Sequence, residues 1–402
     1  MAVILLTSCS DEVMESHHEK LKPLTPIGFG GIIPQDGAQT RTSFDVGGNT
    51  FWPYNELYPM PINKEFTTIG AFMTQDEGAG AGARNEYTSI SGYFSYLETN
   101  SWETTVGVRP ESYYIFGYMP SNLGSLSVTT SKRTGSWADG CVMHFKDLNT
   151  VTPADVCVVV GVLKATVTHE DPSDPESPVI LANIDADPAD PNDNHLTQGI
   201  YSYRGTEHDN YVYLLLDHLY TNVNLELSLD PNYATLRTIV LRQIKMKAKN
   251  IKDVVDVDVT LTNSPTSPIQ NIQFPPDFTS SGNVDALIYP RSDEDGMIVS
   301  SDPEHPTSVP GYFAPGMTTA SFEFEFHYDV YDKDGEDLLS DPEHPVFGNC
   351  VREGCIAVNK WTLPGSGVQN GKSFKVKATI KPTYLFMLSN PDLDNPTIEL
   401  EN

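Results

Sequence analysis

The chain has 402 residues, of which 39% are hydrophobic and 10% aromatic. This composition is typical of a folded protein of about two domains, and it excludes an intrinsically disordered chain. Lys and Arg number 25 against 54 Asp and Glu, so the formal net charge is −29. An acidic surface repels phosphate groups, which argues against nucleic acid or anionic lipid headgroups as partners.

The first residues resemble a bacterial lipoprotein signal. An apolar run over residues 2–6 leads into Leu6-Thr7-Ser8-Cys9, and the polar residues 10–12 follow. Small residues before the cysteine let a signal peptidase approach the backbone. The leader is short and lacks a basic segment, so the natural start could lie further upstream, or these residues could form a short buried strand. We predict lipidation at Cys9 and a signal and tether over residues 1–23.

Alternation of apolar and polar residues dominates the rest of the chain. Segments with this pattern, or rich in β-branched and aromatic residues, are 66–73, 87–97, 113–119, 157–168, 223–229, 243–249, 255–261, 322–328 and 374–380. Period-two segments bury one face and expose the other, as strands of an antiparallel sandwich do. No segment offers an amphipathic helix of three turns. The sequence therefore predicts an all-β fold.

An acidic, proline-rich stretch separates the strands into two groups. It covers residues 170–194 and includes Asp171-Pro172-Ser173-Asp174-Pro175. Proline removes a backbone donor and fixes φ, which is typical of a loop or linker. We place a domain boundary near residue 200, which gives an N-terminal domain over 24–200 and a C-terminal domain over 201–402.

Three polar features of the sequence are candidate ligand sites. The acidic segment 332–337 lacks the glycine spacing of an EF-hand and follows a strand, so a polar turn is expected. The Gly-Ala repeat at 78–83 lacks the lysine and Ser/Thr of a phosphate loop. The hexapeptide Ser-Asp-Pro-Glu-His-Pro occurs at 301–306 and 340–345 and predicts two exposed turns. A metal site of paired His and acidic residues is the less favoured alternative.

Four further cysteines, Cys141, Cys157, Cys350 and Cys355, could pair as disulfides in an exported protein or serve as small buried hydrophobes. The sequence leaves both alternatives open. The absence of a CxxC motif argues against a zinc site. No nucleophile elbow, HExxH or Cys/His catalytic signature is present. We therefore predict that the protein is not an enzyme and needs neither a metal nor a cofactor.

Three segments carry a family resemblance in combination. The first is the lipobox, followed by the apolar run 26–33 and by Thr40-Arg41-Thr42. The second is the aromatic segment 113–120, which ends in Tyr118-Met119-Pro120. The third is the C-terminal segment 381–396. In this order and spacing they are similar to the fimbrillins, the pilin-like surface lipoproteins of Bacteroides and its relatives.

The resemblance implies two tandem transthyretin-like β-sandwich domains and export as a lipoprotein to the outer-membrane surface. It also implies assembly with other fimbrial subunits by strand exchange, after a protease cuts behind an arginine. The matching position is Arg41, with Thr42 as the new N-terminus, and residues 24–33 would be the removed strand. Such removal is physically available if that strand lies at a sheet edge. If it is instead central and locked by pairing on both sides, its removal would destroy the domain.

The strand donated to a neighbour would come from the C-terminal segment. The candidates are Tyr384, Leu385, Phe386, Met387 and Leu388, or residues 397–400; both could instead complete the second domain's own sheet. The predicted function is a structural or adhesive fimbrial subunit, with host or bacterial surface ligands as further partners and the membrane reached through the lipid alone. Stalk, anchor and tip roles stay open. The alternative is a surface glycan-binding lipoprotein, with Trp52 and Trp102 stacking on sugars unless they pack in the core.

Overall fold

The computed structural model describes residues 24–34, 44–46, 49–53, 68–76, 88–94, 102–103, 106–164, 166–169, 178–181, 198–273, 279–289, 296–314, 322–339, 355–361, 373–382, 391–393 and 397–400. These residues form strands almost throughout, which confirms the all-β prediction. Their two short helices are the 3-10 turn Trp137–Asp139 and α2 (Pro231–Ala234). None of the described helices has the length and apolar character needed to cross a membrane.

Two sheets make up a first lobe. The larger contains, in spatial order, β16 (Asn210–His218), β12 (Cys157–Lys164), β8 (Ser112–Met119), β4 (Thr68–Thr74), β5 (Thr88–Phe94), β6 (Trp102–Glu103), β1 (Thr25–Pro34), β3 (Asn49–Pro53) and β2 (Phe44–Val46), with β15 (Ser202–Arg204) on β8 and β7 (Gly107–Val108) on β1. The smaller contains β20 (Ile269–Gln273), β19 (Val254–Thr262), β10 (Gly140–Asn149) and β9 (Ser127–Lys132).

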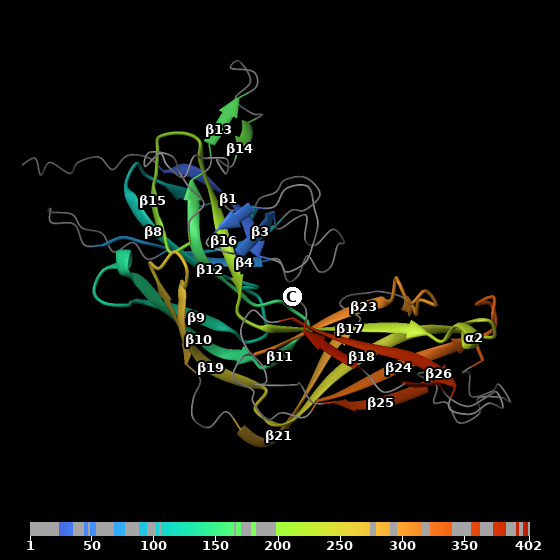
Figure 1. The fold of residues 1–402 in the computed structure, drawn as a ribbon. Coiled ribbons are helices and arrows are strands. Elements are labelled where there is room, and N and C mark those ends of the chain that lie inside the picture. The colour runs from blue at the N-terminus through green and yellow to red at the C-terminus, as the bar shows by residue number, and fades with distance from the viewer. Residues whose placement is uncertain are drawn as a thin grey trace, which may run out of the picture.

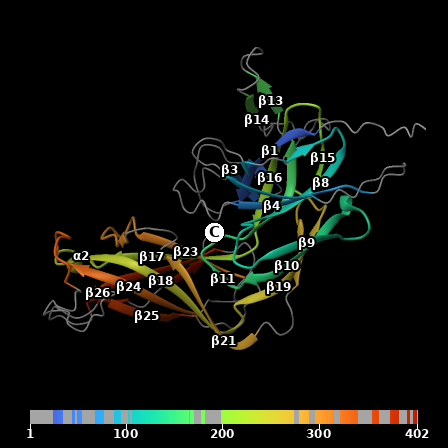
Figure 2. The same ribbon diagram turned by 180° about the vertical axis from the view of Figure 1, so that it is seen from behind.

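Two further sheets make up a second lobe. One contains β11 (Val151–Thr152), β23 (Thr307–Phe313), β17 (Thr221–Leu229), β26 (Ser373–Pro382) and β27 (Pro391–Leu393), with β28 (Thr397–Leu400) on β26. The other contains β21 (Thr279–Tyr289), β18 (Thr238–Ile251), β24 (Phe322–Tyr331) and β25 (Cys355–Trp361), with β22 (Met297–Ile298) on β18. Figures 1 and 2 show the two lobes as separate layered bodies that meet near β11.

Each lobe is held together by apolar side chains between its sheets. In the second lobe, Val223 and Leu225 of β17 share one buried cluster with Ile244 of β18 and Phe324 of β24. In the first lobe, Phe116 of β8 and other side chains of the larger sheet pack with β10 and β19. The predicted alternation is regular in β17, where buried and partly exposed residues alternate over all nine positions. Facing sheets of this kind make sandwiches, as predicted, while the transthyretin-like connectivity stays a prediction.

The sheets of the first lobe include strands from both sides of residue 200, the predicted domain boundary. β15 and β16 follow that residue and still pair with β8, β12 and β1. Residues 254–273 also return to the first lobe, because β19 pairs with β10. The proline-rich stretch contains one described strand, β14 (Pro178–Leu181), which pairs with β13 (Thr166–His169). Strand pairing therefore crosses the predicted boundary, and the division into domains 24–200 and 201–402 stays a prediction.

The two polar turns within the described residues are folded as expected. Asp332 follows β24, and its Oδ1 accepts hydrogen bonds from the backbone N–H of Glu336 at 2.8 Å and of Asp337 at 3.2 Å. In the first hexapeptide, Asp302 accepts from the Glu304 N–H at 2.9 Å and lies 2.8 Å from Nδ1 of His305. Both segments use their acidic side chains to satisfy their own backbone or a near neighbour. The second hexapeptide, 340–345, lies outside the described residues.

Candidate functional site

Strand β1 closes the larger sheet of the first lobe into a ring. The sheet runs from β16 through β12, β8, β4, β5 and β6 to β1, and β1 pairs back onto β16. This last pairing is parallel and joins six residue pairs, from Ile27 with Asn210 to Ile32 with Leu215. In Figure 1 the two strands lie side by side in the first lobe. The predicted removable strand is thus the element that completes the sheet.

The other side of β1 is paired in short pieces. Thr25 and Pro26 pair with β7, Phe29 pairs with Trp102 of β6, and the last three residues pair with β3. Strand β1 is therefore paired on both sides and is not an edge strand, contrary to the arrangement that its removal was expected to need. Its long continuous partner is β16, whereas three separate strands share its opposite side.

Two side chains of β1 enter the core of the ring. Ile27 is 3% exposed and Phe29 is 1% exposed, and both join the buried cluster that contains Val212 and Leu214 of β16. Between them, Gly28 lies against the ring of Tyr211: a Cβ added to the glycine would stand 2.5 Å from the Tyr211 Cδ2 atom. A strand that is to fill this slot needs two apolar residues with a glycine between them.

The buried amide of Asn210 holds the beginning of β1. Its Oδ1 accepts hydrogen bonds from the Tyr203 hydroxyl at 2.6 Å and the Thr206 N–H at 2.8 Å. Its Nδ2 donates to Thr25 Oγ1 at 2.9 Å and to the Thr206 carbonyl at 2.9 Å. Thr25 Oγ1 in turn lies within donating distance of the Val108 carbonyl, at 3.1 Å. We call Asn210, Tyr203, Thr206 and Thr25 the polar latch.

The polar latch is neutral around physiological pH. Burial, with a smaller contribution from neighbouring Tyr113, raises the pKa of Tyr203 well above its usual value. The hydroxyl therefore stays protonated and donates to Asn210. Asn210 itself is 6% exposed and does not titrate. Since a buried amide is costly unless it is paired, its position opposite β1 ties the strand to a specific register.

The described strands contain two parallel pairings. One is β1 with β16, and the other is β17 with β26, which joins eight residue pairs from Asn222 with Ser373 to Leu229 with Ile380. Strands β16 and β17 follow one another in the chain, with Leu219 and Tyr220 between them. Each lobe therefore contains one parallel pairing: β1 lies along β16 in the first lobe, and β26 lies along β17 in the second. Both β1 and β26 are far in sequence from the strand that they pair with.

Most predicted site residues lie outside the described residues: Cys9, Arg41, Thr42, Tyr384, Leu385, Phe386, Met387 and Leu388. Of the donor-strand alternatives, residues 397–400 form β28, which pairs antiparallel with β26 in the second lobe. The two tryptophans of the glycan alternative are placed by their backbones: Trp52 pairs with Ile33, and Trp102 pairs with Phe29. Both thus lie on strands next to β1.

Asn210, Gly28 and Tyr211 were not predicted from the sequence. The signal for Asn210 is weak but present, because it is an amide at the head of the otherwise apolar and aromatic run Tyr211-Val212-Tyr213-Leu214-Leu215. A polar residue at the start of a buried strand needs a partner, and the nearest candidates in sequence do not include Thr25. The pairing across the ring could not be read from local pattern.

Comparison with known proteins gives similarity at the level of structure. No model of a protein family matches the sequence, and no curated protein matches it. A fimbrial protein from Bacteroides vulgatus shares 13% identity with a TM-score of 0.37, over 94% of this chain and 99% of that one. The fimbrial anchor protein Mfa2 from Porphyromonas gingivalis shares 9% identity with a TM-score of 0.24, over 93% of this chain and 99% of that one.

A third solved structure, described as a candidate cell adhesion protein from Bacteroides ovatus, shares 11% identity with a TM-score of 0.39. That match covers 95% of this chain and 98% of the other. Identities this low transfer no activity from those proteins to this chain. These three solved structures are thus described as fimbrial or cell adhesion proteins of Bacteroides and Porphyromonas.

Proposed function

We propose that the protein is a subunit of a cell-surface fimbria, exported as a lipoprotein through Cys9, and that β1 is a replaceable strand whose removal prepares the subunit for assembly. The single observation that carries this proposal is the ring closure by β1. The family resemblance of the sequence supports it. The proposal includes no catalytic step, since the chemistry is supplied by the processing protease.

The position of Arg41 fits such a removal. In the sequence it lies between the end of β1 at Pro34 and the start of β2 at Phe44. Cleavage there would separate β1 from every other described strand. Because β1 is parallel to β16, no tight hairpin can join the two, and backbone hydrogen bonds and packing alone would then retain the strand.

The rest of the ring can stay paired when β1 leaves. The path β16-β12-β8-β4-β5-β6 is continuous without β1. One open edge would be β16, whose residues 210–215 would lose their pairing with β1, and an apolar slot would replace Ile27 and Phe29. Unpaired strand edges next to apolar slots are strong templates for an added strand.

An incoming strand would recover what β1 contributed. Each buried apolar side chain is worth about 1.5–3 kcal/mol, and each backbone hydrogen bond about 0.5–1.5 kcal/mol. A strand from a second subunit with matching apolar residues restores both terms, so exchange costs little at equilibrium. The proposed donor is the C-terminal segment, either residues 384–388 or β28, which among the described strands pairs with β26 alone.

The test treats the purified full chain with an Arg-specific protease. The expected product lacks residues 1–41 and forms multimers that survive a denaturing gel without heating and dissociate on heating. The matched control is Arg41→Lys, which keeps the charge and removes the cleavage site. That variant should stay intact and monomeric.

Two results would overturn the proposal. One is a cleaved chain that loses β1 and remains a folded monomer at every concentration. The other is equal multimer formation by the Arg41→Lys variant, which would show that assembly does not need the removal of β1.

A further inference from the structure

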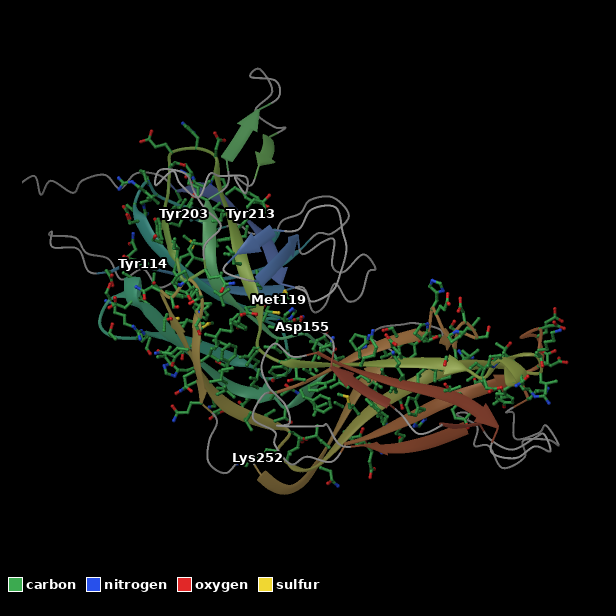
Figure 3. All side chains as sticks on the ribbon, viewed as in Figure 1. Tyr114, Met119, Asp155, Tyr203, Tyr213 and Lys252 are labelled. Atoms are coloured by element: carbon green, nitrogen blue, oxygen red, sulfur yellow. The ribbon has the colours of Figure 1, made fainter. Side chains whose placement is uncertain are left out.

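A cluster of three potential metal ligands lies at the junction of the two lobes. Asp155 precedes β12, Cys157 is the first residue of β12, and His218 is the last residue of β16. Within the described residues this is the group of His, Cys, Asp or Glu side chains that could together hold a metal ion. Figure 3 shows Asp155 at the end of the first lobe that faces the second.

The backbone fixes the three side chains on one side of the sheet. Cys157 and His218 are directly opposite one another in the antiparallel pairing of β12 with β16. Asp155 is two residues before Cys157, a spacing that puts both side chains on the same face of an extended chain. A hydrogen bond of 2.8 Å from the Leu219 N–H to the Val156 carbonyl holds the two segments together at this point.

The distances are close to those around a bound ion. Nδ1 of His218 lies 2.8 Å from Asp155 Oδ2 and 3.8 Å from Cys157 Sγ, and the ligand atoms all lie within 4.8 Å of one another. Tetrahedral zinc with ordinary bond lengths separates a sulfur from a nitrogen ligand by about 3.5 Å and a nitrogen from an oxygen by about 3.4 Å. The site needs the His218–Asp155 distance to widen by about half an ångström.

The site is enclosed and carries negative charge. Cys157 is fully buried, the Asp155 side chain is 7% exposed, and the His218 side chain is 24% exposed. The carboxylate of Asp217 is also near, because it accepts a hydrogen bond of 2.8 Å from the His218 N–H. The partial exposure of His218 gives solvent a route to the open position that three protein ligands leave on a tetrahedral ion.

The surroundings of the cluster favour the protonated forms of the Cys157 thiol and the His218 imidazole. Burial, with the nearby Asp155 charge, raises the pKa of the Cys157 thiol to about 12. Burial lowers the pKa of His218, but the Asp155 carboxylate outweighs it and raises that pKa well above the usual value.

We propose that Asp155, Cys157 and His218 form a binding site for a zinc-class divalent ion, with water as the fourth ligand. Thiolate, imidazole and carboxylate together suit zinc and not magnesium or calcium, which take oxygen ligands. The ion clamps the start of β12 to the end of β16, where the chain leaves the first lobe for β17. In this proposal the ion ties the two strands together and takes no part in strand exchange.

The test titrates the full chain with Zn²⁺ and with Co²⁺ after chelator treatment. We expect one zinc per chain by elemental mass spectrometry, and a near-ultraviolet thiolate-to-cobalt charge-transfer absorption with Co²⁺. We also expect Zn²⁺ to raise the melting temperature. Because this titration uses the unaltered chain, its result remains valid even if a substituted variant fails to fold.

Matched variants assign the ligands. Cys157→Ala and His218→Gln should abolish the cobalt absorption and weaken zinc binding at least tenfold. The control for the cysteine is Cys141→Ala, another buried free thiol of the first lobe. The control for the histidine is His144→Gln, whose Nδ1 lies 2.7 Å from Asp258 and which does not belong to the ligand cluster found among the described residues. Both controls should bind as the unaltered chain does.

Two results would overturn the site. Absence of binding at micromolar Zn²⁺ by the folded, reduced chain would leave Asp155 and His218 as an ordinary buried ion pair. Zinc that remains bound in Cys157→Ala with unchanged affinity would place the ion elsewhere.

Discussion

Strands β1 and β26 are counterparts in the two lobes and differ in how firmly they are held. Each lies parallel to one of two consecutive strands, β1 along β16 and β26 along β17. Strand β26 is paired over eight residues and buries Phe374, Val376, Ala378 and Ile380. Strand β1 is paired with β16 over six residues. Among its described side chains, those of Ile27 and Phe29 are buried.

The far sides of the two strands differ as well. Strands β27 and β28 cover β26 over seven residue pairs and come from the chain that follows it. The far side of β1 is divided among β3, β6 and β7. A strand with fewer pairs and divided neighbours is the one that leaves at lower cost, provided that the chain is cut next to it. This difference favours β1 over β26 as the replaceable strand that we propose.

The largest expected effect concerns the two phenylalanines. Phe29→Ala should lower the free energy of unfolding of the intact chain by about 3–5 kcal/mol, because it empties a buried site. Phe374→Ala should have a cost of similar size. After cleavage at Arg41, the Phe29→Ala chain should behave like the unaltered one, since the strand has gone, whereas Phe374→Ala stays destabilised. Urea titrations before and after cleavage measure both, and a cost of Phe29→Ala that survives cleavage would contradict the assignment.

The polar latch gives the next largest effect. Asn210→Ala would leave the Tyr203 hydroxyl, the Thr206 N–H and Thr25 Oγ1 without this partner in a buried place, at a cost of about 2–3 kcal/mol. The loss should appear as faster hydrogen exchange at the start of β1, measured by mass spectrometry, while β26 keeps its protection. Uniform exchange across both strands would show instead that Asn210 supports the whole fold.

Gly28 offers a smaller effect with its own control. Gly28→Ala would push a methyl group into the ring of Tyr211, and we expect a cost of about 1–2 kcal/mol. Combining it with Tyr211→Leu should cost less than the sum of the two changes, because the ring that blocks the methyl group is gone. Thermal unfolding of the unaltered chain, the two single variants and the double variant measures this. Strict additivity would show that the Tyr211 ring does not restrict which residue can occupy position 28.

The smallest effect belongs to an ion pair on β26. Lys375 Nζ lies 2.9 Å from Glu226 Oε1 of β17, with both side chains partly exposed. Lys375→Ala should lower the free energy of unfolding by less than about 1 kcal/mol, and the difference should shrink in high salt. An effect above 2 kcal/mol would mean that surface charge, and not buried pairing, holds β26.

Local pattern predicted strands such as β17 and β19 well, because each buries one face along its whole length. It could not predict the ring, since the pairing of β1 with β16 joins residues about 180 positions apart and leaves no local signal. The same reason hid the cluster at the lobe junction, where Asp155 and His218 are 63 positions apart. Sequence motifs detect neighbours along the chain, and these sites are built across it.

The state of the cysteines is another feature that the sequence alone could not decide. The sequence left open whether Cys141 and Cys157 form disulfides or stay as buried thiols. The structure shows both as free and buried, and it places Cys157 opposite His218. Cys350 lies outside the described residues, and Cys355 is placed by the backbone of β25. The disulfide alternative is therefore settled for the first two and stays open for the second two.

The most direct test of the account follows the amides of β16 and β17 through cleavage at Arg41, using hydrogen exchange at low protein concentration. We predict that residues 210–215 exchange faster once β1 is gone, that residues 222–229 keep their protection, and that 210–215 become protected again when the cleaved chains assemble. Simultaneous loss of protection in both strands, or no change in either, would contradict the claim that β1 is a replaceable strand.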